Sequence, residues 1–200
     1  MTLTQTPIAV LGTLAEFHEE PIPYDLAALV QLVATINPDL LCLDITPEQW
    51  QQQDFSNLPP EYAQALLPLA RQTDMVVVPI AGQHLPPRPQ TTGWREQFIQ
   101  LLRSWLARLQ RTAPSPAAIN QGWRHHLAAT LYSLTRSLAG SDIRRDYWQH
   151  TADLTQAVAD IAQRDPGRRI LVVVNVQHCH HIRPRLRQQP GIIVKTYLDL

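Results

Sequence analysis

Short apolar runs separated by helical patterns constrain the fold of this chain more than any other feature. The clearest runs are Leu40–Ile45 and Ile170–Val174, in which nearly every residue is apolar. Such runs are typical of strands that are covered on both faces of a sheet. Strands that alternate with helices are joined by right-handed crossovers and lie parallel. The sequence therefore predicts an α/β fold with a mostly parallel sheet flanked by helices.

Turn signals place the boundaries of these elements. Asn37 and Pro38 end the first helix, because proline disfavours helical backbone in the residue before it. Asp165-Pro166-Gly167 is a turn signal before the fourth strand. The strands are expected at residues 7–12, 40–45, 75–80, 169–174 and 192–198. The helices outside the middle of the chain are expected at residues 23–36, 60–72 and 181–188.

The middle of the chain, residues 92–163, is predicted to be an α-helical insertion within a single α/β domain of residues 1–200. It follows a proline-rich loop at 82–92, its apolar residues recur at helical spacing, and Ser141 is the expected N-cap of its third helix. We interpret four of its residues as a helix–helix core: Trp94, Trp105, Trp123 and Trp148. The alternative is an aromatic lid over the strand ends, and both can hold because a lid must itself be packed.

Composition indicates an ordinary soluble globular protein, with 44% hydrophobic and 17% charged residues. No apolar run approaches the roughly 20 residues that span a bilayer, and Met1–Thr6 lacks the features of a signal peptide. We therefore expect a cytoplasmic protein without a membrane partner. Cys42 and Cys179 form neither a disulfide framework nor a CxxC zinc pattern, and Cys42 is expected to be a small buried residue.

The net charge of zero conceals an asymmetry between the two halves of the chain. Residues 1–99 carry three arginines and eleven acidic residues, whereas residues 100–200 carry fourteen basic and six acidic residues. The arginines are spread along helices, so we interpret the asymmetry as pairing between the halves. No nucleic-acid partner is expected, because neither the isoelectric point nor a motif supports one.

Three residues that follow strands form the candidate catalytic site: His18, Asp44 and His178. The carboxyl ends of parallel strands line the ligand crevice of an open sheet, so residues far apart in sequence can converge there. Asp44 lies in an apolar run, where an ionised carboxylate must be paired, solvated or bound to metal. The alternative for His18 and His178 is that they lie in polar surface loops.

The candidate metal ligands are His18 and, in the segment 178–181, His178 and His181. His181 can accompany His178 if a helix begins there, and His180 can do so in an extended chain. Two histidines and a carboxylate match catalytic zinc or non-haem iron. Without a metal, the same group could carry out acid–base chemistry. His125 and His126 are read as surface or packing residues, and His150 gives no signal.

Charged residues near the strand ends are candidate substrate-binding groups: Arg145, Asp146 and Glu19. An arginine at the start of the third inserted helix could bind an anionic substrate group or hold Asp44. Asp146 is equally well explained as an acid in a first helical turn, where the helix dipole favours negative charge.

Two segments resemble a known family. The phrase Ile36–Asp44 and the stretch Val174–Leu186, with its histidines after a valine-rich strand, are similar to elements of the TraB/ChaN/Tiki group, the erythromycin-esterase-like superfamily. The resemblance implies an α/β fold with a pocket built from these elements, which here would contain His18, Asp44, Arg145, Asp146 and His178. The roles reported in that group are ester hydrolysis, metal-dependent peptide cleavage and haem binding.

The preferred interpretation is a hydrolase of small-molecule or peptide substrates, in which a histidine activates water directly or through a divalent zinc or iron ion. One alternative is a non-enzymatic module that binds haem or another small ligand. The other is an interaction domain whose ancestral pocket is degenerate.

Overall fold

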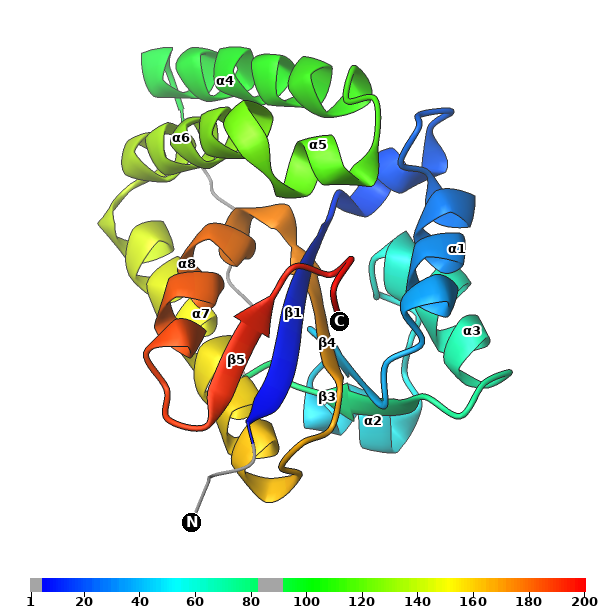
Figure 1. The fold of residues 1–200 in the computed structure, drawn as a ribbon. Helices are drawn as coiled ribbons and strands as arrows, with labels where there is room; N and C mark the ends of the chain where they lie inside the picture. The colour runs from blue at the N-terminus through cyan, green and yellow to red at the C-terminus, as the bar shows by residue number, and fades with distance from the viewer. Residues whose placement is uncertain (1–4, 83–91) are drawn as a thin grey trace.

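The computed structural model describes residues 5–82 and 92–200. Its centre is a five-stranded sheet in the order β3-β2-β4-β1-β5, in which every neighbouring pair is parallel. Figure 1 shows this sheet between helices. The predicted α/β fold with a parallel sheet is confirmed. The strands are β1 (Thr6–Thr13), β2 (Leu40–Leu43), β3 (Val76–Pro79), β4 (Ile170–Asn175) and β5 (Ile192–Lys195).

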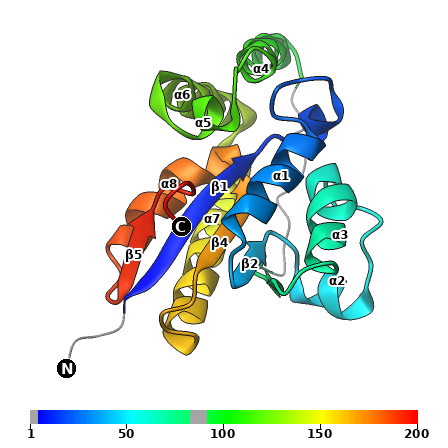
Figure 2. The same cartoon turned by 45° about the vertical axis from the view of Figure 1, so that its right-hand side comes forward.

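Helices cover both faces of the sheet. One face packs against α1 (Leu26–Ile36) and η2 (Glu61–Leu66), through residues such as Leu29 and Leu66. The other face packs against α7 (Ser141–Arg164) and α8 (Val176–Arg187). Figure 2 shows α1 and α3 on one side of the strands and α8 on the other. Burial on both faces explains why β1, β2 and β4 are almost wholly apolar.

The position of β4 makes a topological switch point at one end of the sheet. β4 lies between β2 and β1, yet the helix that follows it, α8, packs on the opposite face from the helices that follow β1 and β2. Neighbouring strands whose connections leave in opposite directions mark the ligand crevice of an open α/β sheet. The site is therefore expected where β2, β4 and β1 end.

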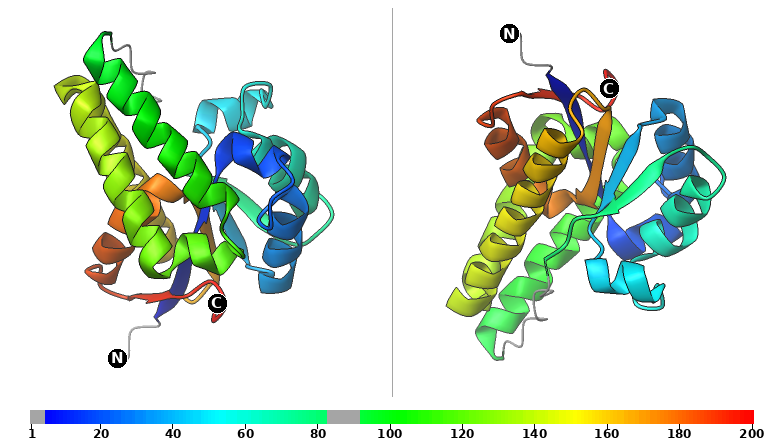
Figure 3. Two further views of the ribbon diagram at one scale, coloured as in Figure 1. Left: turned by 90° about the horizontal axis from the view of Figure 1, so that it is seen from above. Right: turned by 90° about the horizontal axis from the view of Figure 1, so that it is seen from below.

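The predicted helical insertion is present between β3 and β4. It consists of α4 (Trp94–Arg111), α5 (Pro116–Asn120), α6 (Gly122–Ala139) and α7. The first three lie beyond the carboxyl ends of the strands, as the views in Figures 1 and 3 show. Asn120 ties α5 to β1, because its side-chain oxygen accepts from the Gly12 N–H and its amide donates to the Gly12 carbonyl. The role of the insertion as a lid stays a prediction.

Several boundaries differ from those predicted. α8 begins at Val176 rather than near residue 181, because the Asn175 side chain caps it by accepting from the Gln177 N–H. α2 (Pro47–Gln52) was not expected, although Thr46 and Gln49 form a capping box at its start. Ser141 is the first residue of α7 and Gly140 is its N-cap, so that part of the prediction was wrong. The predicted loop at 82–92 lies almost wholly outside the described residues. The remaining helical segments are η1 (Ala15–Glu19) and α3 (Leu67–Ala70).

The tryptophans of the insertion do not form a buried helix–helix core, which corrects our interpretation of the sequence. Their exposed fractions range from 37% for Trp148 to 65% for Trp123. The core between α4 and α6 is made instead by smaller residues, Leu106, Leu109, Ala128 and Leu131. Helical spacing identified an apolar stripe on α4, but the residues that α6 covers lie beside the tryptophan stripe rather than on it.

The charge asymmetry is only partly explained by pairing between the halves. Among the described residues, Arg111 and Glu20 form the one arginine–carboxylate pair between the halves, at 2.6 Å. The other arginine–carboxylate pairs of the described chain are local to the second half. Cys42 and Cys179 are both buried and free. No helix in the described part of the chain has the length and apolarity needed to cross a membrane.

Gly12 allows β1 to approach the first turn of α8. A Cβ atom at this position would lie 2.9 Å from the Cα and Cβ atoms of Val176. We expect Gly12→Ala to lower the free energy of unfolding by about 1–3 kcal/mol, because the backbone of α8 would have to shift. Chemical denaturation of this variant beside Ser133→Ala, on the exposed surface of α6, measures the effect. An unchanged midpoint for Gly12→Ala would contradict the close approach.

Candidate metal centre

Three side chains from distant parts of the chain meet beside the end of β2. They are Asp44, directly after β2, His150 in α7 and His178 in the first turn of α8. Each offers one metal-ligating atom, and these atoms all lie within 4.8 Å of one another. Both histidines are buried, and the Asp44 side chain is 14% exposed. Asp44 is therefore the member of the group nearest to solvent.

The sequence places these residues through three local features. Asp44 follows Leu43, which pairs with Val173 of the neighbouring strand β4. The Asn175 cap begins α8 directly after β4, so that His178 is held beside the sheet. His150 lies on the buried stripe of α7, which also contains Tyr147, Thr151, Leu154 and Val158. The group thus depends on two strand ends and one helix face.

A hydrogen bond to Thr151 orients His178 and fixes its tautomer. The Thr151 hydroxyl donates to the Tyr147 carbonyl at 2.8 Å, so it accepts from Nδ1 of His178, also at 2.8 Å. The proton of the neutral ring therefore sits on Nδ1, and the lone pair of Nε2 meets the Gln177 side-chain amide at the long distance of 3.4 Å. Burial lowers the pKa of His178 to about 3, although the negative charge of Asp44 acts to raise it. A neutral imidazole with one oriented lone pair is the form that binds a metal.

His150 and Asp44 form a hydrogen-bonded pair, with 3.1 Å between His150 Nε2 and Asp44 Oδ2. Burial lowers the pKa of His150, but the hydrogen bond and charge of Asp44 outweigh it, so this pKa lies above the usual value. The other polar atom of each side chain, Asp44 Oδ1 and His150 Nδ1, is buried without a hydrogen-bond partner. Such atoms carry a desolvation cost that a ligand would relieve.

An aromatic and cationic stack packs against His178. Tyr147 lies nearly parallel to the His178 ring, with 4.8 Å between ring centroids and 14° between planes. The guanidinium of Arg136, from α6, lies 3.9 Å from the Tyr147 ring centroid. Tyr147 is held in place by a 2.6 Å hydrogen bond from its hydroxyl to the Gln177 carbonyl. The insertion thus contributes both a member of the group and part of its packing.

The donor set fits a single divalent cation. Two imidazoles and one carboxylate are the ligands of zinc in several hydrolases and of non-haem iron in the 2-His-1-carboxylate sites. Three protein ligands leave at least one coordination position for water or substrate. The two unpartnered buried atoms lie on the same side chains that would bind the cation. The arrangement is therefore suited to metal binding.

The structure places the other predicted site residues apart from this group. The Leu14 N–H donates to Nε2 of His18 at 2.9 Å, and Nδ1 of His18 donates to the Tyr24 carbonyl at 2.7 Å. Both ring nitrogens are thus used, and His18 offers no free ligand atom in this conformation. Glu19 is exposed and accepts from Gln64. Arg145 forms ion pairs with Asp142 and Asp146 on α7.

The two other histidines of α8 have different partners. His181 packs against Trp148, with 4.4 Å between ring centroids. Nδ1 of His180 lies 3.1 Å from Nε2 of His125 on α6. Neither belongs to the group formed with Asp44.

Sequence reasoning missed His150. A usable signal was present, because Tyr147, His150, Thr151 and Leu154 follow the spacing of one helical face. A histidine on the apolar stripe of an amphipathic helix is a candidate for the protein interior. That signal does not say which strand end the histidine meets.

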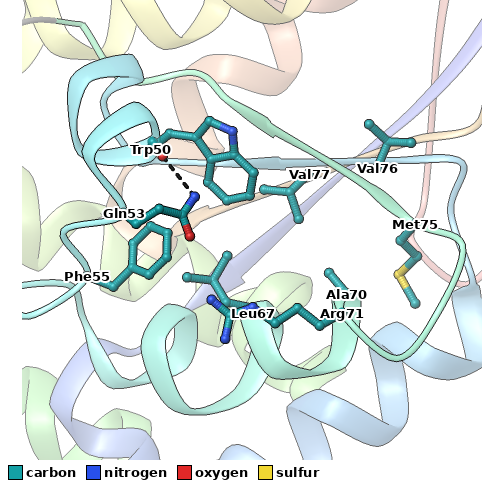
Figure 4. A pocket seen from close by; sticks show the side chains of 9 residues that line it. All are labelled: Trp50, Gln53, Phe55, Leu67, Ala70, Arg71, Met75, Val76 and Val77. Carbon is teal, nitrogen blue, oxygen red and sulfur yellow. Dashed lines mark hydrogen bonds between the residues drawn. The ribbon is translucent and has the colours of Figure 1, made fainter.

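A hollow elsewhere on the molecule lacks comparable chemistry. It lies beside β3 and is lined by nine residues, among them Trp50, Phe55, Leu67 and Val77, as Figure 4 shows. Its one charged lining residue is Arg71, and no histidine or carboxylate belongs to the lining. A second hollow, at η1 and the start of α1, does bring His18 and Glu19 together with Glu20 and Asp25, but both ring nitrogens of His18 are already bonded to backbone there.

Comparison with known proteins gives no match: no family model, no curated protein and no solved structure is similar to this chain.

The buried, neutral state of His18 predicts a dependence of stability on pH. Burial lowers the pKa of His18 to about 4 from 6.5 in the unfolded chain, despite the hydrogen bond to Tyr24. Between these values the unfolded chain binds the proton and the folded protein does not. The contribution of His18 is therefore complete above about pH 6.5 and is lost as the pH falls toward 4, by an amount on the order of 3 kcal/mol.

Denaturation of the wild type and of His18→Gln at several pH values measures this contribution. We expect the variant to lose less stability than the wild type between about pH 6.5 and 4. His126→Gln, which changes an exposed histidine, should follow the wild-type profile. Equal pH profiles for His18→Gln and the wild type would show that His18 is not the titrating group.

Proposed function

We propose that this protein is a metal-dependent hydrolase whose divalent cation is bound by Asp44, His150 and His178. The observation that carries the proposal is the convergence of three suitable ligand atoms within 4.8 Å. The two unpartnered polar atoms, Asp44 Oδ1 and His150 Nδ1, support it further. A cation at this position would supply Lewis-acid activation of a water molecule.

The residues of the chain have distinct roles in this proposal. His178 binds through Nε2, since Thr151 holds the opposite ring nitrogen. Asp44 supplies negative charge that compensates the cation, and it lies at the solvent-facing edge where a substrate arrives. A histidine must be neutral to bind a metal, and Asp44 raises the pKa of His150, so binding would weaken as the pH falls.

A hydrolytic reaction is also what the resemblance to the TraB/ChaN/Tiki group implies. Asp44 and His178, which lie in the two segments that carry that resemblance, both belong to the three-residue group. In our proposal His150 takes the place that the sequence suggested for His18. Haem binding is less well supported, because three ligand atoms this close together suit one small cation rather than a planar macrocycle.

Removal of a ligand should abolish tight metal binding. We expect wild-type protein to bind about one equivalent of Zn²⁺ or Co²⁺ through this group. Asp44→Asn, His150→Ala and His178→Ala should each weaken binding by more than about tenfold. Calorimetric titration measures the affinity, and the absorption spectrum of the Co²⁺ form reports the coordination number.

The matched control is His126→Ala, which removes an exposed histidine outside the group. Binding that is lost equally in His126→Ala and His178→Ala would contradict the assignment. Hydrolysis is tested separately, on ester and peptide substrates with the metal-loaded protein. Metal binding without hydrolysis of any substrate would retain the site and remove the proposed reaction.

Thr151 is predicted to orient His178 for metal binding. Thr151→Val keeps the shape of the side chain but removes the oxygen that accepts from His178 Nδ1. We expect metal affinity to fall by about 10- to 100-fold, the usual effect of losing such a partner. Thr155→Val is the control, because Thr155 is a buried threonine on the same helix whose hydroxyl donates to the Thr151 carbonyl. Equal affinities in the two variants would contradict the role of Thr151.

A further inference from the structure

One helix of the insertion exposes a stripe of large apolar side chains. Trp94, Phe98, Leu101 and Trp105 follow one another at intervals of four, three and four residues along α4, and all are exposed. At 100° per residue, these four side chains lie within about 60° of one another around the helix. The buried residues of α4, such as Leu106 and Leu109, form a separate stripe that contacts α6. α4 therefore has one apolar stripe packed inside the protein and a second that faces solvent.

α6 carries a matching exposed stripe, formed by Trp123, Leu127 and Leu134. Its residues that contact α4, Ala128 and Leu131, are displaced from this stripe by about a quarter turn. The same displacement occurs on α4, and the two helices run antiparallel. In an antiparallel pair of helices, two stripes that are rotated by the same angle and in the same sense from the line of contact face the same side of the pair. The exposed stripes of α4 and α6 therefore form one surface. Figure 3 shows α4 and α6 lying side by side when the molecule is viewed from above.

The seven side chains together form what we call the hairpin face: Trp94, Phe98, Leu101, Trp105, Trp123, Leu127 and Leu134. Their exposed fractions range from 41% to 65%. Exposed apolar patches of this kind mark surfaces that bind proteins, membranes or ligands. The hairpin face lies opposite the side of α6 that packs on the body of the protein, where His125 and Arg136 are buried.

The charge of the hairpin selects among these partners. Residues 92–140, which contain α4, α5 and α6, carry six arginines and one glutamate, but Arg111 is paired with Glu20 and Arg136 is buried. Arg95, Arg103 and Arg108 of α4 are exposed, and in the described part of the chain they form no ion pair. Arg95 and Arg124 lie over the rings of Trp94 and Trp123, at 5.7 and 5.0 Å. At 100° per residue, Arg95 and Arg108 flank the apolar stripe of α4, whereas Arg103 lies on the opposite side of the helix.

We propose that the hairpin face docks onto an anionic membrane surface. Helices that lie in a membrane interface combine tryptophan, phenylalanine and leucine on one face with arginine or lysine beside it. Tryptophan favours the level of the lipid headgroups, and arginine can bury its apolar stem while its guanidinium reaches lipid phosphate. The flanking arginines complement acidic headgroups. This docking requires no spanning helix and does not depend on the proposed metal chemistry.

A second copy of the chain is a weaker candidate for the same surface. A two-fold contact through the hairpin face would bring the exposed, unpaired Arg95 and Arg108 of two copies close together, and like charges at close range repel. The earlier expectation of no membrane partner rested on the lack of a long apolar run, which concerns spanning and not surface binding.

Vesicle binding by the full chain tests the proposal. We expect co-sedimentation with phosphatidylcholine vesicles that contain about 30% phosphatidylserine, with a blue shift of tryptophan fluorescence. Binding should be weak to pure phosphatidylcholine and should fall as salt rises from about 0.1 to 0.5 M. Trp105→Ser combined with Trp123→Ser should lower partitioning at least about tenfold. Arg95→Gln combined with Arg108→Gln should lower it by about thirtyfold.

The matched control is Leu198→Ser, which removes an apolar side chain that is 67% exposed but lies outside the hairpin face. It should bind vesicles as the wild type does, and unfolding midpoints should show that all the variants remain folded. Absence of binding to acidic vesicles, or equal binding to neutral vesicles, overturns the proposal. Sedimentation of the wild type as a dimer that Trp105→Ser and Trp123→Ser dissociate, without vesicle binding, would assign the face to a second copy.

Discussion

The arrangement of the molecule depends on the placement of β4 between β1 and β2. Its residues pair with both neighbours, and Ile170 to Val174 are completely buried. This pairing brings the C-terminal part of the chain between two strands from its beginning. Because α8 leaves β4 toward the opposite face from the helices after β1 and β2, the carboxyl end of the sheet is a topological switch point. Asp44 and His178 meet there because their strands are neighbours.

The predictable part of the site follows from strand ends. Asp44 and His178 each come shortly after an apolar run, and a parallel sheet brings such positions to one edge. His18 satisfies the same rule, yet both its ring nitrogens bond to nearby backbone. The sequence does not encode that difference visibly, because it depends on the turn of η1. His150 was missed because helical spacing tells which face is buried, but not which strand end that face meets.

The insertion shows a second limit on what the spacing of apolar residues can predict. Apolar residues on α4 occupy nearly half of the helix surface, and spacing alone does not say how much of this surface a neighbouring helix covers. α6 covers Leu106 and Leu109 with small and medium side chains, and this packing leaves Trp94 and Trp105 outside. The strands were easier to predict, because a strand that is apolar on both faces can bury its side chains only if helices cover both faces of the sheet.

The proposed metal site is supported by the free energy that it costs to bury Asp44 and His150 when no ligand is bound. Asp44 and His150 place a hydrogen-bonded pair in a mostly buried position, and each keeps one buried atom without a partner. A buried pair with incomplete hydrogen bonding is a poor source of stability, since desolvation offsets its attraction. His178 beside it stays neutral and adds no compensating charge. A divalent cation would bind the carboxylate of Asp44 and accept a lone pair from each of the two histidine rings. The proposed metal binding would therefore explain the group better than fold stability does.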